Sequence, residues 1–203
     1  MLSLNWLLLE KIAFQLDRRS LKNLSETAKS INNALPSMDR RKAWFMSYTE
    51  CCYLKLIDII MMKLRMDWGD PSADNNRLII WASQNGHNKI IEILLKDSQV
   101  NPSTCNNSAI RWASGNGHDK IVEILLKDQR VDPSACYNRA IRFASQNGHD
   151  KIVEILLKDP RVDPSADNNF AIRLAEQNGH AKVVKILSKD PRVDPSTANC
   201  TVS

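Results

Sequence analysis

The sequence predicts an all-α protein in which helix-turn-helix units stack into a solenoid behind a short N-terminal domain of three helices. The first observation is internal repetition: the tripeptide Asn-Gly-His occurs four times at intervals of 31 residues, at 85–87, 116–118, 147–149 and 178–180. A fixed period of this kind is typical of stacked supersecondary units that cannot bury their apolar faces alone. The second observation is composition, because 43% of the residues are hydrophobic and the chain can therefore build a core.

Each repeat is expected to contain two helices, and its third copy, residues 132–162, illustrates the pattern. The Asp-Pro-Ser sequence at 132–134 predicts a turn, because proline fixes φ and has no N–H to donate. Apolar positions within 140–144 share one helical face, and Gly148 stands where a helix ends in a left-handed conformation. The second helix, expected over 150–158, is apolar on most sides and must therefore pack between its partner helix and the next repeat.

This unit resembles the ankyrin repeat, whose signature is Thr-Pro-Leu-His-x-Ala-Ala, then Gly-His, then Val-Val-x-Leu-Leu-Leu. Isoleucine stands at the signature leucine, alanine at the first signature alanine, and arginine in place of the signature histidine. These residues are Ile110, Ile141 and Ile172, then Ala113, Ala144 and Ala175, then Arg111, Arg142 and Arg173. The period of 31 residues, against about 33 in the family, implies shortened connecting loops. The resemblance covers residues 70–197 and implies an ankyrin-type helix-turn-helix solenoid.

We expect three segments along the chain. Residues 1–40 differ in composition and lack Gly-His, residues 41–69 form a degenerate capping repeat or connector, and residues 70–203 carry four ankyrin-like repeats. The capping repeat is inferred because residues 56–62 are similar to the second helix of a later repeat, although no Gly-His precedes them. A degenerate terminal unit is expected in a solenoid, since it meets a different neighbour.

The N-terminal segment resembles an F-box, a family that reads Leu-Pro-x-Glu-Val-Leu-x-x-Ile-Phe-x-x-Leu, then Asp-Leu-x-x-Leu, then Val-x-Arg/Lys-x-Trp. Asn5, Leu7, Ser20 and Thr27 stand in place of the family's proline, glutamate, aspartate and valine. The resemblance implies that these helices dock on the Skp1 subunit of a cullin-RING ubiquitin ligase. The residues expected to make this contact are Leu4, Trp6, Leu8, Leu9, Ile12, Leu16, Leu21 and Leu24.

Two hypotheses of function follow from these resemblances. In the first, the protein is an adaptor whose F-box-like segment recruits Skp1 while its repeats bind a target protein. In the second, the protein is an ankyrin-repeat scaffold or decoy with no ubiquitin-ligase link, and its N-terminal helices only cap the solenoid. An F-box followed by ankyrin-type repeats resembles an arrangement found in large DNA viruses and some protists.

A target-binding surface is expected where the repeats differ from one another, because the core positions return almost unchanged. The varying turn and loop-tip positions are Asn75, Arg77, Asn106, Ser108, Tyr137, Arg139, Asn168 and Phe170. Solenoids present such positions along an extended concave face, although drift at solvated loop tips would produce the same variation. The aromatic-rich row Trp81, Trp112, Phe143 and Leu174 directly precedes the core alanine, and we expect it to pack between repeats.

The sequence argues against a metal site, because all four histidines belong to the Gly-His pairs. Equivalent residues of stacked repeats lie about a helix diameter apart, too far to share one zinc ion. Each imidazole is instead expected to hydrogen-bond the turn between the two helices of its repeat. With no nucleophile motif and no Gly-rich phosphate loop in the chain, we expect neither catalysis nor a cofactor.

Charge and cysteine content point to protein partners inside the cell. The net charge of +5 is modest and the basic residues are interleaved with acids, which argues against nucleic-acid binding. No apolar run approaches the ~20 residues of a membrane helix, and no signal-peptide pattern is present. The five cysteines lack metal or disulfide spacing. We therefore expect a cytoplasmic or nuclear protein (in the host cell, if viral) that is monomeric within a larger complex.

Overall fold

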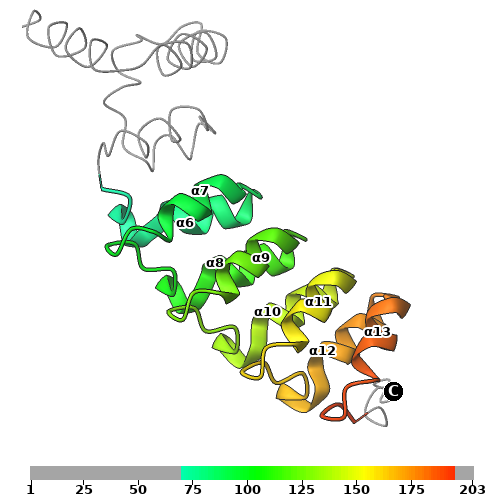
Figure 1. The fold of residues 1–203 in the computed structure, drawn as a ribbon. Coiled ribbons are helices and arrows are strands. Elements are labelled where there is room, and N and C mark those ends of the chain that lie inside the picture. The colour runs from blue at the N-terminus through cyan, green and yellow to red at the C-terminus, as the bar shows by residue number, and fades with distance from the viewer. Residues whose placement is uncertain (1–69, 195–203) are drawn as a thin grey trace, which may run out of the picture. The chain divides into compact units, whose positions relative to one another are not determined.

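The computed structural model describes residues 70–194, which lie in the second of the two units into which the chain divides, Met1–Gly69 and Asp70–Ser203. This part of the chain is all helical, with no strand. Its helices are α6 (Ala73–Gln84), α7 (Asn88–Leu94), α8 (Thr104–Gly115), α9 (Asp119–Leu126), α10 (Ala135–Gln146), α11 (Asp150–Leu157), α12 (Ala166–Gln177) and α13 (Ala181–Leu187). They stack as helix-turn-helix layers (Figure 1), which confirms the predicted all-α solenoid. The predicted F-box-like segment, capping repeat and Skp1 contacts lie outside the described residues.

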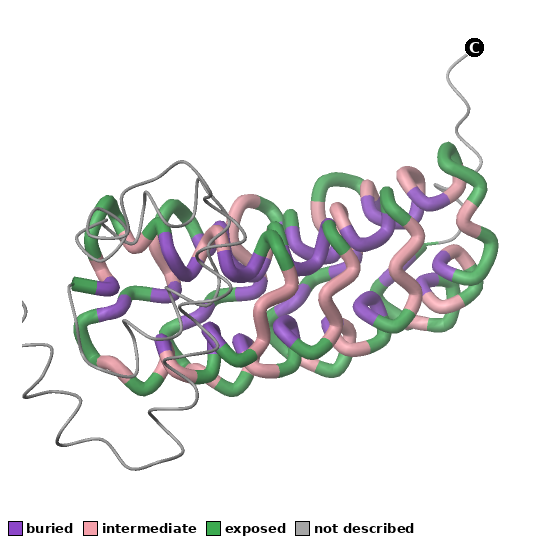
Figure 2. Tube along the Cα trace, turned by 90° about the horizontal axis from the view of Figure 1, so that it is seen from above, coloured by how far each residue is buried: buried purple, intermediate pink, exposed green. Residues whose placement is uncertain are grey.

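The core lies between a row of first helices and a row of second helices. Figure 2 shows the buried residues concentrated between these two rows. In the third repeat, Ala140, Ile141 and Ala144 are at most 1% exposed, as their shared helical face predicts. The first helices α6, α8, α10 and α12 pack against one another more extensively than the second helices do. The first helices are therefore the more closely packed of the two rows.

Each first helix opens with one left-handed turn, which the sequence pattern does not predict. In α10 the residues 136–138 have φ values of 56° to 57°, and the matching residues of the other first helices have φ values of 51° to 58°. Left-handed backbone costs most L-amino acids about 1–2 kcal/mol per residue, and asparagine and aspartate tolerate it best. Segments 74–76, 105–107 and 167–169 are rich in these two residues, whereas the third repeat places Tyr137 there.

The last asparagine of each left-handed turn joins neighbouring repeats. The Oδ1 atom of Asn107 accepts a hydrogen bond from the backbone N–H of Asp132 in the next repeat, at 2.8 Å. Asn107 is only 7% exposed, so this bond is sheltered from water. The same bond is made by Asn76, Asn138 and Asn169, at 2.7, 2.8 and 3.2 Å. The left-handed turn thus aims a polar side chain at the repeat that follows.

The Asn-Gly-His motif joins repeats at the other end of the first helix. Nε2 of His149 donates to the backbone carbonyl of Gly115 at 2.9 Å, and Nδ2 of Asn147 donates to the same oxygen at 2.8 Å. The last carbonyls of a helix have no partner within it, so the motif satisfies a group of the preceding repeat. His118 and His180 make the same bond, to the carbonyls of Gln84 and Gln146. The expected bond within the histidine's own inter-helix turn is thus replaced by one across the repeat boundary.

An aspartate–arginine pair holds three of the four connecting loops among the described residues to the preceding repeat, and the loop after the first repeat carries Gln99 in place of the arginine. Arg161 donates to Asp159 at 2.6 Å through Nη2 and to the carbonyl of Val131 at 2.7 Å through Nη1. The hydrogen bond from Arg161 lowers the pKa of the Asp159 carboxyl, although partial burial opposes this shift. The pairs Asp128–Arg130 and Asp190–Arg192 repeat the arrangement, and the pKa values of both aspartates are lowered by the arginine hydrogen bond.

We predict that Asn107→Ala lowers the free energy of unfolding by about 1–2 kcal/mol, because the N–H of Asp132 loses its acceptor and alanine is less suited to left-handed backbone. The matched control is Asn106→Ala. Asn106 has a similar φ of 55°, against 57° for Asn107, but its side chain is exposed. Urea unfolding measures both variants, and equal losses would contradict the inter-repeat role of Asn107.

A second prediction concerns the glycine of the motif. Gly148 and Gly179 both have φ of +73°, but a Cβ on Gly148 would lie 2.6 Å from Nδ1 of His180, whereas one on Gly179 would meet nothing within 4 Å. Gly179→Ala should therefore lower the free energy of unfolding by about 1 kcal/mol, which is the cost of left-handed backbone alone. Gly148→Ala should lose roughly 1–2 kcal/mol more, because the ring of His180 must move off its hydrogen bond. Thermal unfolding of the two variants tests this, and a Gly179→Ala loss as large as that of Gly148→Ala would refute it.

The aspartate–arginine pairs predict a dependence of stability on pH. Because the pKa of Asp159 is lower in the folded state, its stabilisation is present above a pH of about 4, the pKa of an unfolded aspartate, and is lost as pH falls through the folded value. Asp159→Asn should lose about 1 kcal/mol at pH 7, a figure reduced by the partial exposure of Arg161. Its stability should then fall less than that of wild type between pH 5 and 3.

The control for this experiment is Asp163→Asn, which copies the asparagine that the second repeat carries at the equivalent position, Asn101. The Asp163 carboxyl accepts hydrogen bonds from the N–H and hydroxyl of Ser165, and an amide oxygen can accept both as well. Urea midpoints measured from pH 7 to pH 3 should be nearly those of wild type for Asp163→Asn. A shallower pH dependence in both variants would argue against a specific role of Asp159.

Candidate protein-binding surface

The residues predicted to bind a target lie on the left-handed turns and at the start of the right-handed part of each first helix. Six of the eight are exposed: Asn75, Arg77, Asn106, Tyr137, Arg139 and Asn168. Tyr137 is 80% exposed, and among the described residues only Trp112, at 41%, is another large hydrophobic side chain so open to solvent. The six positions recur from layer to layer, so they form a row along the side of the solenoid that carries the first helices.

Ser108 departs from the expectation, because it is only 6% exposed. Its hydroxyl donates to the carbonyl of Cys105 at 2.8 Å and accepts from Nη2 of Arg111 at 2.7 Å. A short side chain at this position folds back on its own left-handed turn, whereas the long side chains of Arg77 and Arg139 reach solvent. Ser108 therefore supports the fold and does not belong to the exposed row.

Phe170 is half-buried and supports two arginines. Its ring centroid lies 4.5 Å from the guanidinium carbon of Arg142 and 5.0 Å from that of Arg173. Arg142 also forms an ion pair of 3.3 Å with Asp167. The ring is therefore covered by side chains of its own repeat and of the preceding repeat. The groups available to a partner in this part of the row are the two guanidinium groups.

The second and third repeats form a patch that the sequence indicates only in part. Trp112 was expected to pack between repeats, but it is 41% exposed and touches the next repeat through Phe143, with ring centroids 6.3 Å apart. The guanidinium of Arg139 lies over the ring of Phe143 at 4.6 Å. We call Trp112, Tyr137, Arg139 and Phe143 the central patch.

A single glycine explains why the central patch forms at this boundary. Gly115 occupies the position that is Gln84, Gln146 and Gln177 in the other repeats. A Cβ on Gly115 would lie 3.3 Å from the ring of Phe143, so the glycine allows the phenyl ring to settle against α8. The ring can then support Arg139. This loss of a side chain in one repeat is the signal in the sequence that could have located the patch.

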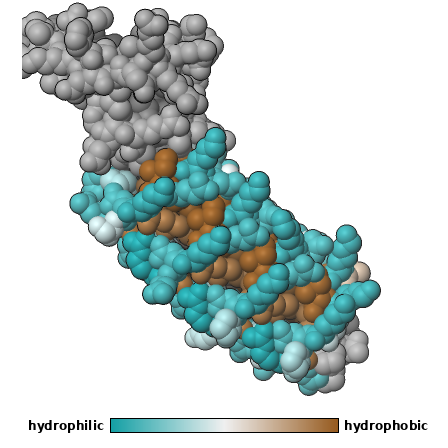
Figure 3. Space-filling model, viewed as in Figure 1, coloured by the Kyte–Doolittle hydropathy of each residue, from teal (hydrophilic) through white to brown (hydrophobic). Residues whose placement is uncertain are grey.

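The second helices carry a different surface. Figure 3 shows an apolar band that crosses the repeats between hydrophilic side chains. Apolar side chains of the second helices that remain half-buried are Ile93, Leu95, Ile124, Leu126, Ile155, Leu157, Val184 and Ile186. Between α7 and α9 lies an open groove of about 700 Å³. The looser packing of the second helices leaves this space.

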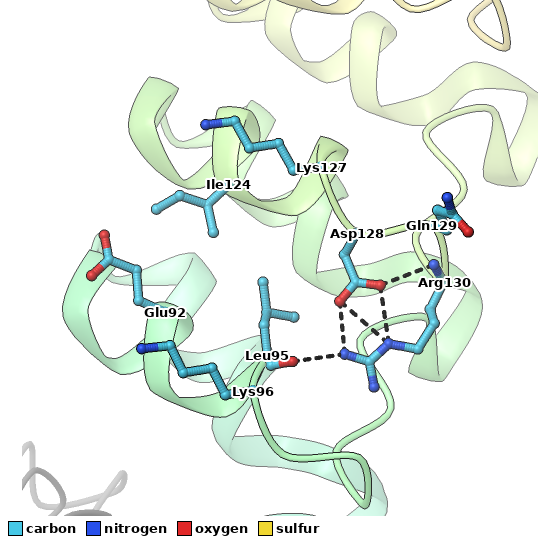
Figure 4. A pocket seen from close by; sticks show the side chains of 8 residues that line it. All are labelled: Glu92, Leu95, Lys96, Ile124, Lys127, Asp128, Gln129 and Arg130. Carbon is cyan, nitrogen blue, oxygen red and sulfur yellow. Dashed lines mark hydrogen bonds and ion pairs between the residues drawn. The ribbon is translucent and has the colours of Figure 1, made fainter.

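The groove has a mixed apolar and charged lining. It is lined by apolar Leu95 and Ile124 together with charged and amide side chains, and by no serine, cysteine or histidine. At its edge Arg130 is held by the Asp128 carboxylate and by the carbonyl of Leu95, as Figure 4 shows. The Asp128–Arg130 pair at the edge of the groove therefore holds the connecting loop in place.

The described residues also show neither a metal centre nor a membrane span. Within residues 70–194, no three or more histidine, cysteine, aspartate or glutamate side chains come together in a way that could hold a metal ion. Three of the four histidines donate Nε2 to a carbonyl of the preceding repeat. None of the helices in this part of the chain has the length and apolar character needed to cross a membrane.

Comparison with known families identifies the repeats. Residues 49–135 match a family model described as Ankyrin repeats (3 copies). The match covers less than half of the chain and begins within the segment 41–69, and the repeats beyond it have the same helix-turn-helix layout. No curated protein matches the chain. The matched residues are therefore similar to ankyrin repeats, which are modules of protein–protein interaction.

Proposed function

We propose that this ankyrin-repeat chain is a substrate-recruiting adaptor, in which the repeats hold a target protein and the N-terminal segment docks on the Skp1 subunit of a cullin-RING ubiquitin ligase. The observation that carries the first half is the contrast between invariant and varying positions. The core and the asparagine bond to the following repeat return in every described layer, whereas exposed positions such as Tyr137 and Arg139 differ between layers. The positions that differ between repeats are therefore mostly exposed positions, where a partner protein can contact them.

The second half of the proposal rests on the resemblance of residues 1–40 to an F-box. The leucines and isoleucine of that resemblance would pack against Skp1 as an apolar helical surface, with Trp6 as an aromatic anchor. Neither half of the protein would carry out chemistry. The adaptor would instead raise the concentration of the target near the ligase, which is an effective-concentration effect and requires an intracellular location.

A scaffold or decoy without a ligase link is the second candidate function. The observation that favours it is that the family match covers repeats alone. The inter-repeat bonds and the exposed row do not depend on Skp1, so the repeats can bind a target under either hypothesis. Docking on Skp1 is therefore the property that separates the two functions.

We predict that the full chain recovers purified Skp1 in a pull-down, and that Leu9→Asp combined with Ile12→Asp abolishes the recovery. Two carboxylates in an apolar interface would be desolvated without partners, which should reduce affinity by at least about a hundredfold. Gln15→Asp, a charge at a polar position of the same predicted helix, is the control and should recover Skp1 like wild type. Failure of the wild-type chain to recover Skp1 would exclude the adaptor and leave the scaffold.

A further inference from the structure

We infer that the central patch binds an acidic segment of the target protein, in which a carboxylate pairs with Arg139 and a neighbouring apolar or aromatic side chain packs on Trp112. The inference rests on the proposed protein-binding function and names the chemistry of the partner. It does not depend on docking to Skp1.

The first argument is that the guanidinium of Arg139 is exposed and has no carboxylate partner among the described residues. The side chain is exposed, and its guanidinium stacks on Phe143 at 4.6 Å. It forms no hydrogen bond or ion pair with any residue in 70–194, in contrast to Arg142, which pairs with Asp167. The planar fork of a guanidinium fits a carboxylate through two parallel N–H···O bonds. The ring of Phe143 already orients that fork, so less freedom is lost on binding.

The second argument is the conformation of Tyr137. Its φ is 57°, in a region that tyrosine adopts at a cost of about 1–3 kcal/mol, and the equivalent residues Asn75, Asn106 and Asn168 are of a type that tolerates it. The side chain is 80% exposed, so packing does not compensate the strain. Tyrosine, tryptophan and arginine are the residue types that dominate binding energy at protein interfaces, and the central patch contains all three.

The third argument is charge. Helices α8 and α10 together carry Arg111, Arg139 and Arg142 and contain no acidic residue. The acidic Asp167, in the following helix, is paired with Arg142 and so leaves Arg139 uncompensated. A positive surface with exposed aromatic rings favours an acidic partner, and the ankyrin repeats indicate that this partner is a protein. An extended peptide of about ten residues spans roughly 33 Å, enough to follow the row across layers about 10 Å apart.

The probe for this inference is a fluorescein-labelled glutamate peptide of about ten residues with one central tryptophan, and its lysine counterpart is the control peptide. Fluorescence anisotropy with the full chain should show binding of the glutamate peptide and none of the lysine peptide. Arg139→Glu should weaken binding by at least about tenfold. Arg139→Lys, which keeps the charge but loses the fork, should weaken it by about threefold.

The matched control is Lys89→Glu, the same charge reversal at an exposed position on the second helix α7, and it should change the affinity by less than about twofold. Tyr137→Ala combined with Arg139→Ala should remove binding while leaving the melting temperature nearly unchanged, because both side chains are exposed. A large fall in melting temperature would contradict the assignment of these residues to the surface.

Three results would overturn the inference: no binding of the glutamate peptide to wild type, equal weakening by Arg139→Glu and Lys89→Glu, or equal competition by a single-stranded oligonucleotide. These outcomes are separable from failure of the proposed function. Skp1 recovery without glutamate-peptide binding would leave the adaptor standing and remove the acidic partner. Peptide binding without Skp1 recovery would support the acidic partner and favour the scaffold.

Discussion

The hydrogen bonds that cross each repeat boundary are the constraint on which the rest of this structure depends. A single layer cannot bury its apolar face, so the protein is stable only if neighbouring layers meet in one register. Three polar contacts define that register: histidine to helix carbonyl, asparagine to the following turn, and arginine to loop carbonyl. Each satisfies a backbone group that would otherwise be unpaired, and an unpaired buried group costs about 1–3 kcal/mol. A shift of register would break all three contacts at once.

This constraint also separates the side chains that support the fold from those that are free to bind. Arg111 and Arg161 donate hydrogen bonds from their guanidinium N–H groups to carbonyls and carboxylates of the solenoid itself. Arg139 has no such partner among the described residues and rests only on an aromatic ring. In a repeat protein most charged residues look alike in the sequence, because they recur with the period. The hydrogen bonds show which of them remain available to a partner.

Several features of the fold were predictable because they depend on short-range pattern. The apolar faces of the helices, the glycine that ends each first helix and the turn at Asp-Pro-Ser follow from spacing and backbone preference alone. The left-handed turns were not predicted, because three consecutive residues in left-handed backbone produce no hydrophobic period. Only the recurring asparagine pairs, at positions such as 106–107, indicate these turns in the sequence. Among site residues, Tyr137 and Arg139 are exposed as expected, whereas Ser108 is buried and Trp112 is more exposed than its packing role implied.

The sequence by itself determined the all-α class, the order of the helices and the identity of the core positions, because each of these is set by residues within one 31-residue unit. The tertiary structure alone decided which partner each histidine and asparagine finds and which aromatic rings reach solvent. Those outcomes depend on a neighbour one period away along the chain, as Gly115 shows by making room for Phe143. The exposure of a side chain at a repeat boundary is a property of two layers together, and no single repeat encodes it.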